Sequence, residues 1–120
     1  MKNIWLELPK PFLCLAPMEG VTDSAFRRVI VKAGKPDLMF TEFTSADGLL
    51  SKGYDHVNER LTYDRVEQPL IAQIWGSNPD NLYQTATYVK HRGFVGIDLN
   101  LGCAVRAVMS KGCGASLIGK

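Results

Sequence analysis

The sequence lacks any long apolar run, and its charges nearly cancel. The apolar stretches fall far short of the roughly 20 residues that a helix needs to cross a bilayer, so we expect no membrane segment. The first ten residues hold no apolar core of the kind that secretory signals carry. With 14 Lys plus Arg against 12 Asp plus Glu, the net charge is +2. This balance neither predicts nor excludes nucleic-acid binding, because a local basic patch can act where the total is small.

Cysteine is scarce, and none of the three cysteines stands in a spacing typical of metal sites. Cys103 and Cys113 are ten residues apart, Cys14 is remote, and both histidines, His56 and His91, lie elsewhere in the sequence. Zinc sites ordinarily use closely spaced Cys or His pairs, so no metal site is predicted. An odd number of unpaired cysteines is typical of the reducing cytoplasm, and we expect a cytoplasmic protein.

The rest of the composition is that of a globular domain. Apolar residues make up 46% of the chain and charged residues 22%, which excludes a disordered or fibrous chain. A chain of 120 residues has room for one domain with a modest core. No internal repeat, low-complexity tract or interdomain linker interrupts the sequence.

Short apolar runs alternate with longer amphipathic segments. The apolar runs predict strands at residues 12–16, 38–41, 70–75 and 95–100. Capping residues and a 3.6-residue period predict helices at residues 23–33, 45–51 and 78–92, and a further helix beginning near residue 115. Residues 52–68 are polar and weakly periodic, and fit either a short helix or a long loop. The side chains expected to face the core are Cys14, Phe26, Val29, Ile30, Ala33, Leu49, Leu50, Leu82, Ala86 and Val89.

Strands that are apolar on both faces and alternate with helices predict an α/β fold with a parallel sheet. Two architectures fit this pattern: an open doubly wound sheet, and part of a (β/α)8 barrel of the TIM type. The nucleotide-binding fingerprint GxGxxG does not follow the first strand, where residues 17–20 read PMEG instead, and this disfavours the open sheet. A closed barrel needs eight strands and about 250 residues, so four strands leave a half-barrel or a small open sheet.

Polar residues and glycines follow the predicted strand ends. Residues 17–20 come after the first strand, Glu42 after the second, Gln73 lies in the third, and Asn100 and Cys103 follow the fourth. The carboxyl ends of parallel strands meet at one rim, where the active sites of such folds lie. Position alone is equally compatible with ordinary polar loops.

Four segments in this order resemble the tRNA-dihydrouridine synthase family. They read LAPMEGVTD at residues 15–23, TEF at 41–43, QIWG at 73–76 and DLNLGC at 98–103, with GCGA at 112–115 following. The resemblance implies a (β/α)8 barrel that binds flavin mononucleotide (FMN). Residues 1–120 would then form its N-terminal half, with about the first four β/α units. The C-terminal half and a helical tRNA-binding domain would be absent.

The resemblance also implies an activity: reduction of specific uridines in tRNA to 5,6-dihydrouridine, with NADPH reducing the flavin. The flavin-binding residues that it carries over are Pro17, Met18, Glu19, Gln73 and Asn100. Cys103 would be the catalytic acid that protonates C5 of the uracil after a hydride reaches C6. An ordinary thiol, with a pKa of about 8.5, is protonated at neutral pH yet acidic enough to release its proton.

The sequence departs from the family in one residue and in its length. Ala104 stands where the family usually has proline directly after the cysteine. A half-barrel would expose a strand edge, and self-association would cover it. Three alternatives therefore stay open: a truncated remnant without catalysis, an RNA-binding or assembly module, and a flavin oxidoreductase resembling dihydroorotate dehydrogenase.

Overall fold

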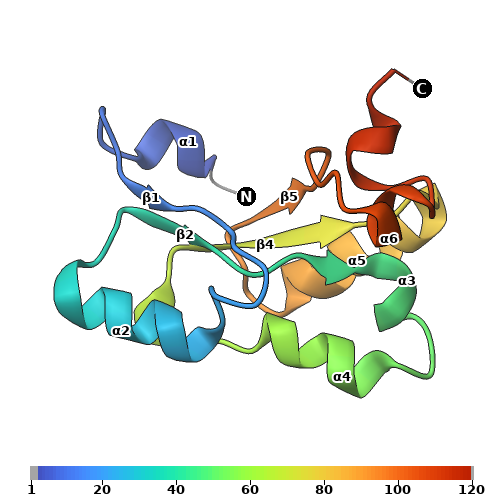
Figure 1. Ribbon diagram of the computed structural model, residues 1–120. Helices are drawn as coiled ribbons and strands as arrows, with labels where there is room; N and C mark the ends of the chain where they lie inside the picture. The colour runs from blue at the N-terminus through green and yellow to red at the C-terminus, as the bar shows by residue number, and fades with distance from the viewer. Residues whose placement is uncertain (1–2, 120) are drawn as a thin grey trace.

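The computed structural model describes residues 3–119 as a single parallel sheet with helices against it (Figure 1). The strands are β1 (Cys14–Leu15), β2 (Leu38–Phe40), β3 (Thr44–Ser45), β4 (Leu70–Trp75) and β5 (Gly96–Leu99). The α-helices are α1 (Ile4–Glu7), α2 (Ser24–Gly34), α3 (Ala46–Leu49), α4 (Tyr54–Asn58), α5 (Pro79–His91) and α6 (Arg106–Met109). Three 3-10 turns complete the described part: η1 (Glu59–Leu61), η2 (Arg65–Glu67) and η3 (Gly114–Leu117).

Every strand pair is parallel, which confirms the predicted α/β class, and the sheet is not closed. β4 is central: β2 and β3 pair along one edge of it, and β5 pairs along the other. β1 pairs with β2 at the outer edge. In Figure 1 the helices α2, α4 and α5 lie on one side of the sheet, while α1 and the segment around η3 lie on the other. Among residues 3–119, no helix is long and apolar enough to span a bilayer.

The centre of the fold follows the sequence closely. β4 spans the predicted residues and is almost fully buried. The Asn78 side chain caps α5 by accepting hydrogen bonds from the next turn, and Pro79 occupies the first helical position. Gly93 ends the helix with a φ of 88°, which a residue with a side chain adopts rarely. These local signals place α5 beside β4, and Val89 is fully buried there.

The two faces of the sheet differ in what covers them. Leu70, Ala72 and Ile74 of β4 belong to the main core, which packs against the helices. Ile71 points to the other face, where it packs with Leu8 and Leu38. Gln73 follows Ile71 on that same face, toward the carboxyl end of the strand. The face of the sheet that carries Ile71 and Gln73 is therefore apolar at the amino end of β4 and polar at the carboxyl end.

The expectation of a buried strand at residues 12–16 with Cys14 in the core is wrong. Leu13 is 74% exposed, Cys14 is exposed, and the strand shortens to two residues. β1 is an edge strand that pairs only with β2 among the described residues, and Cys14 lies across from Leu38 on the face opposite the main core. Apolar composition alone does not reveal which strand lies at an edge.

The expected core-facing stripe of α2 is wrong at Val29 and Ala33, whereas Phe26 and Ile30 are partly buried and the Asp23 cap is confirmed. Val29 is 62% exposed and Ala33 is exposed, whereas Arg27 is completely buried. The helix is rotated so that a charged residue faces inward. In α3, Leu49 is buried as expected, but Leu50 is 46% exposed.

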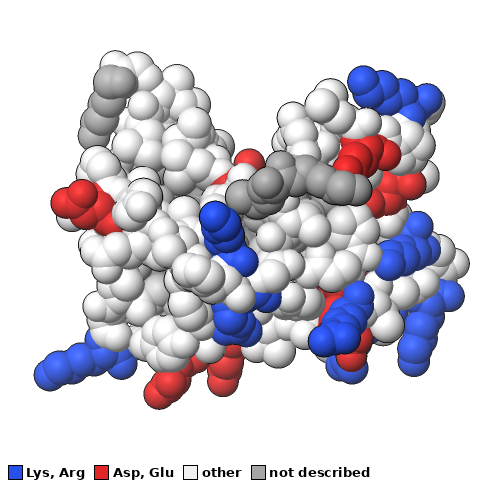
Figure 2. Space-filling view, turned by 180° about the vertical axis from the view of Figure 1, so that it is seen from behind, with Lys and Arg blue, Asp and Glu red and all other residues white. Residues whose placement is uncertain are grey.

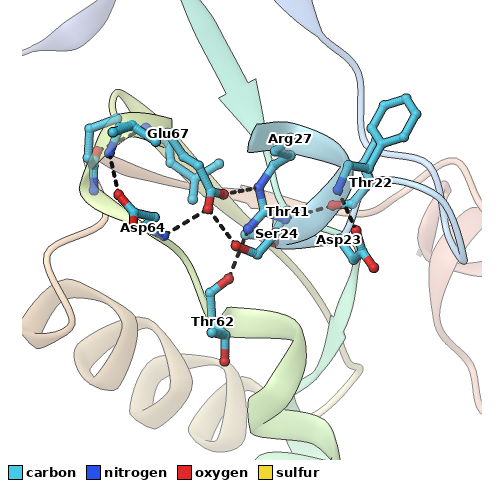
Figure 3. Close-up of polar contacts among 12 residues, drawn as sticks. Thr22, Asp23, Ser24, Arg27, Thr41, Thr62, Asp64 and Glu67 are labelled. Carbon is cyan, nitrogen blue, oxygen red and sulfur yellow. Dashed lines mark hydrogen bonds and ion pairs between the residues drawn. The ribbon is translucent and has the colours of Figure 1, made fainter. Parts of the chain in front are cut away.

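Arg27 is buried because a matching carboxylate, Glu67, is buried opposite it (Figure 3). Arg27 Nε donates to Glu67 Oε2 at 2.5 Å, Nη1 to the Thr22 carbonyl at 2.6 Å, and Nη2 to the Thr62 carbonyl at 2.9 Å. Glu67 Oε1 accepts from Ser24 Oγ at 2.5 Å and from the backbone N–H of Asp64 at 2.7 Å. The pair thus ties α2 to the segment that the sequence left unassigned, which folds as α4, η1 and η2.

The chain after β5 also differs from expectation. α6 is not predicted by the sequence, and the helix expected near residue 115 is the short 3-10 turn η3. Neither element has a side-chain cap, so neither carries the signal by which helices are recognised in a sequence.

Candidate functional site

The carboxyl ends of the parallel strands gather the polar residues that the sequence singles out. Residues 17–20 follow β1, Glu42 follows β2, Gln73 lies near the end of β4, and Asn100 and Cys103 follow β5. Gln73 is 7% exposed and Glu42 8%. Buried polar side chains at this end of a parallel sheet mark it as the candidate site.

A chain of hydrogen bonds joins Gln73 to the loop that carries Cys103. Gln73 Nε2 donates to Asp98 Oδ2 at 2.5 Å, and Gln73 Oε1 accepts from Asn100 Nδ2 at 3.1 Å. Asn100 Oδ1 in turn accepts from the backbone N–H groups of Gly102 at 3.2 Å and Cys103 at 2.9 Å. A carboxylate only accepts hydrogen bonds, so the amide nitrogen of Gln73 faces Asp98 and its amide oxygen faces Asn100. The amide nitrogen of Asn100 then faces Gln73, and its oxygen faces the backbone of residues 102 and 103.

A bulge between β2 and β3 turns Glu42 toward this site. Phe40 pairs with Ile71 and Thr44 with Ile74, so three residues on one strand oppose two on β4. The Thr41 hydroxyl fills the gap: it accepts from the backbone N–H of Gln73 at 3.1 Å and donates to the Glu42 carbonyl at 2.8 Å. Bulges of this kind redirect side chains next to functional sites.

Glu42 holds the loop after β1. Its Oε1 accepts from the backbone N–H of Gly20 at 2.6 Å. Arg60 forms an ion pair with Glu19 and lies 3.8 Å from Glu42 Oε1. Arg60 and Glu19 are 31% and 42% exposed, so the pair contributes about 0–1 kcal/mol to stability. Its effect is to connect the loop to η1.

Met18 and Thr22 close the same loop on itself. The Met18 N–H donates to Thr22 Oγ1 at 2.9 Å, and the Met18 carbonyl accepts from the backbone N–H groups of Val21 and Thr22. The Thr22 carbonyl is held by the buried Arg27 (Figure 3). Met18 therefore has its backbone polar groups occupied, and it presents a side chain that is 41% exposed.

Cys103 is partly buried and is held through its backbone on both sides. Its N–H donates to Asn100 Oδ1, and its carbonyl accepts from the N–H of Ala115 at 3.0 Å. The other cysteines differ from it: Cys14 is exposed on β1, and Cys113 is fully buried with its thiol donating to the Lys111 carbonyl. Cys113 therefore packs in the glycine-rich turn.

Two adjoining cavities lie beside this rim and share His56 and Arg60. One, of about 460 Å³, lies against the start of α2 and includes Glu42. The other, of about 380 Å³, extends toward Trp75, whose ring lies 5.9 Å from that of Phe43 and 5.5 Å from Lys111 Nζ. Neither is lined by Gln73, Asn100 or Cys103.

Figure 2 views the molecule from behind and shows a hollow between two raised parts of the surface. Basic and acidic side chains are interspersed over this face, which carries no broad surface of one sign. Away from the strand ends, a cluster of tyrosines joins α4 to α5. There the hydrogen bond between Tyr54 and Tyr88 raises the pKa of Tyr54. A phenol shifted upward stays protonated at neutral pH.

The structure brings the predicted residues together in two groups. Gln73, Asn100 and Cys103 form one hydrogen-bonded chain, while Glu19 belongs to the cluster around Glu42. Pro17, partly buried, and Met18 precede that cluster in the same loop. Sequence analysis assigned no role in the site to four residues that position these two groups: Thr22, Thr41, Arg60 and Asp98. Asp98 was recognisable, because it alternates with Asn100 and so lies on the same strand face.

Residues 14–120 match the family model described as Dihydrouridine synthase (Dus). Over 118 residues, the chain is 48% identical to a probable tRNA-dihydrouridine synthase of Staphylococcus aureus (strain COL). It is 47% identical over 118 residues to probable tRNA-dihydrouridine synthase 2 of Bacillus subtilis (strain 168). Both alignments cover 98% of this chain but 36% of the relative, so the chain spans about a third of the length of these curated relatives.

Proposed function

The chain belongs to the dihydrouridine synthase family, and on this premise we propose that it contributes to the reduction of uridine to 5,6-dihydrouridine in tRNA. The names of the relatives give the reaction and its RNA substrate. The observation that carries the proposal is the hydrogen-bonded chain from Asp98 through Gln73 and Asn100 to Cys103. It couples the amide that we propose to bind the flavin ring, near the carboxyl end of β4, to a thiol in the loop after β5.

FMN is the proposed cofactor, and the donor set of this rim fits its ring. One N–H of the Gln73 amide goes to Asp98 and one lone pair to Asn100, which leaves one donor and one acceptor for a ring edge that alternates N–H and C=O. Met18 has its backbone occupied, so it would contribute its thioether side chain by packing. Pro17 and Glu19 flank it, and Asn100 orders the loop beside the ring.

FMN that NADPH has reduced would supply the hydride that C6 of the uracil accepts. A residue of this chain would supply the proton that C5 of the uracil accepts. Cys103 would transfer its S–H proton to C5, so the new C–H bond forms as the S–H bond breaks and a thiolate remains. Cys103 is only partly buried, so a substrate can approach it, and the hydrogen bond of its backbone to Asn100 limits where the sulfur can lie.

The base must leave its stack in the tRNA to reach such a thiol. Enzymes that act on a base take the nucleotide out of the helix into a pocket. The cavity beside Trp75 and Phe43, about 380 Å³ in volume, offers aromatic surface next to the rim. We propose a cytoplasmic tRNA-modifying role, since the substrate is found there.

Replacing Gln73 with alanine is expected to weaken FMN binding about tenfold, which corresponds to about 1.4 kcal/mol. The variant loses the ring contact and leaves the Asp98 carboxylate without its Gln73 partner. Fluorescence titration of the purified protein with FMN measures the change. Gln84→Ala on the exposed surface of α5 is the matched control and should bind FMN as the wild type does. Equal affinities for all three proteins would remove Gln73 from the flavin site.

The proposed reaction is tested by mixing the purified protein with FMN, NADPH and tRNA transcribed without modifications. Mass spectrometry of the digested tRNA should then reveal dihydrouridine, and NADPH should be consumed in proportion to it. NADPH consumption that is independent of tRNA, without any dihydrouridine, would argue for a flavin oxidoreductase of another kind.

A further inference from the structure

The segment that follows Cys103 runs through α6 and then comes back into contact with Cys103. The N–H of Ala115 donates to the Cys103 carbonyl at 3.0 Å, which closes the loop. The residue just before Ala115 is Gly114, which is buried. Two segments separated by ten residues are thus in direct backbone contact at the proposed catalytic cysteine.

Gly114 approaches Cys103 more closely than any residue with a side chain could. A Cβ atom built on Gly114 would lie 2.5 Å from the carbonyl oxygen of Cys103 and 3.3 Å from its Cβ. Cβ contacts below 3.0 Å essentially never occur in proteins. The obstructing atom belongs to the backbone, so it cannot rotate aside as a flexible side chain would. The third neighbour, Val108 Cγ1, would lie at 3.0 Å.

The backbone conformation of Gly114 adds a second requirement for glycine. Its φ is +60°, in the left-handed region that residues with a side chain adopt rarely. Gly119 has a φ of +90°, but a Cβ there would meet nothing within 4 Å. The two positions share the conformational requirement, and only Gly114 has the contact with Cys103.

We propose that Gly114 is a positioning residue that fixes where the Cys103 thiol lies. The inference rests on the proposed function, in which Cys103 is the acid. Asn100 holds the N–H of Cys103 from the side of β5, and the turn at Gly114 holds its carbonyl from the opposite side. A side chain at residue 114 must push the Cys103 backbone away and displace the sulfur from the uracil C5.

The test is a double-mutant cycle of Gly114→Ala and Cys103→Ala, with dihydrouridine formation followed in the purified protein. Gly114→Ala should lower kcat about 100-fold, as expected for a catalytic group moved by about 1 Å, and leave the KM for tRNA unchanged. In the Cys103→Ala background the same glycine substitution should produce no further loss, because it acts through the thiol. Gly119→Ala is the control and should keep the wild-type kcat.

Each outcome of the cycle decides one question. Wild-type turnover in Cys103→Ala would refute the proposed acid role of Cys103, and the inference about Gly114 with it, while the absence of dihydrouridine in the wild-type protein would refute the proposed function. Slow turnover in Cys103→Ala with full turnover in Gly114→Ala would refute this inference alone. An equal loss from Gly114→Ala in both backgrounds would also refute it, because the effect would not pass through the thiol. If Gly114→Ala fails to fold, Val108→Ala/Gly114→Ala removes the contact with Val108 and keeps the one with Cys103, and the same criteria apply to it.

Discussion

Replacing Cys103 with alanine is expected to slow uridine reduction by about 100- to 10,000-fold, the range that general acid catalysis contributes. Without the thiol, C5 of the uracil has no proton donor held beside it, so hydride transfer to C6 stalls. The backbone of residue 103 keeps its bonds to Asn100 and Ala115, and FMN affinity should not change. Single-turnover oxidation of the reduced flavin by unmodified tRNA measures the rate of this step.

Cys14→Ala makes the same chemical change at a thiol that is exposed on β1. It should leave the single-turnover rate at the wild-type value. A Cys103→Ala variant that oxidises its flavin as fast as the Cys14→Ala control would show that the proton comes from another group. The acid would then have to be sought elsewhere.

Replacing Arg27 with alanine is expected to lower the free energy of unfolding by about 3–5 kcal/mol. The change leaves the Glu67 carboxylate buried without its cation, and it leaves the carbonyls of Thr22 and Thr62 without their donors (Figure 3). Urea unfolding with linear extrapolation measures the loss. Because Thr22 also binds Met18, the variant should in addition bind FMN more weakly.

Arg28→Ala is the matched control, since Arg28 is the exposed neighbour of Arg27 on α2. Its stability should stay within about 0.5 kcal/mol of the wild type. The double variant Arg27→Met/Glu67→Leu removes both charges and should regain part of the loss, because no buried charge remains unpaired. If Arg27→Ala were as stable as Arg28→Ala, the pair of Arg27 and Glu67 would make no measurable contribution to the free energy of unfolding.

The parts of the fold that sequence reasoning predicted are those with strong local signals. β4 has six consecutive residues that are buried or nearly so, and α5 has a cap, a proline and a terminating glycine. The errors arose where tertiary context decides. Cys14 is exposed because β1 is an edge strand, and Arg27 is buried because Glu67, 40 residues away in the sequence, lies opposite it.

The candidate site shows the same division. Gln73, Asn100 and Cys103 were predicted from motifs at strand ends, and the structure joins them by hydrogen bonds. The residues that position them act through contacts between distant segments, as Thr41 does with Gln73 and Gly114 does with Cys103. A sequence gives no measure of such contacts. The family resemblance is confirmed, and the cofactor, the acid and the flavin-binding residues stay predictions.

The most direct test of the central claim is the dihydrouridine content of tRNA from a host that lacks every dihydrouridine synthase gene. The account predicts that expressing the wild-type protein restores dihydrouridine to this tRNA, and that expressing Cys103→Ala at the same level does not. Mass spectrometry of digested tRNA measures both. Equal restoration by the two proteins, or tRNA that stays free of dihydrouridine when the wild-type protein is folded and carries flavin, would contradict the account.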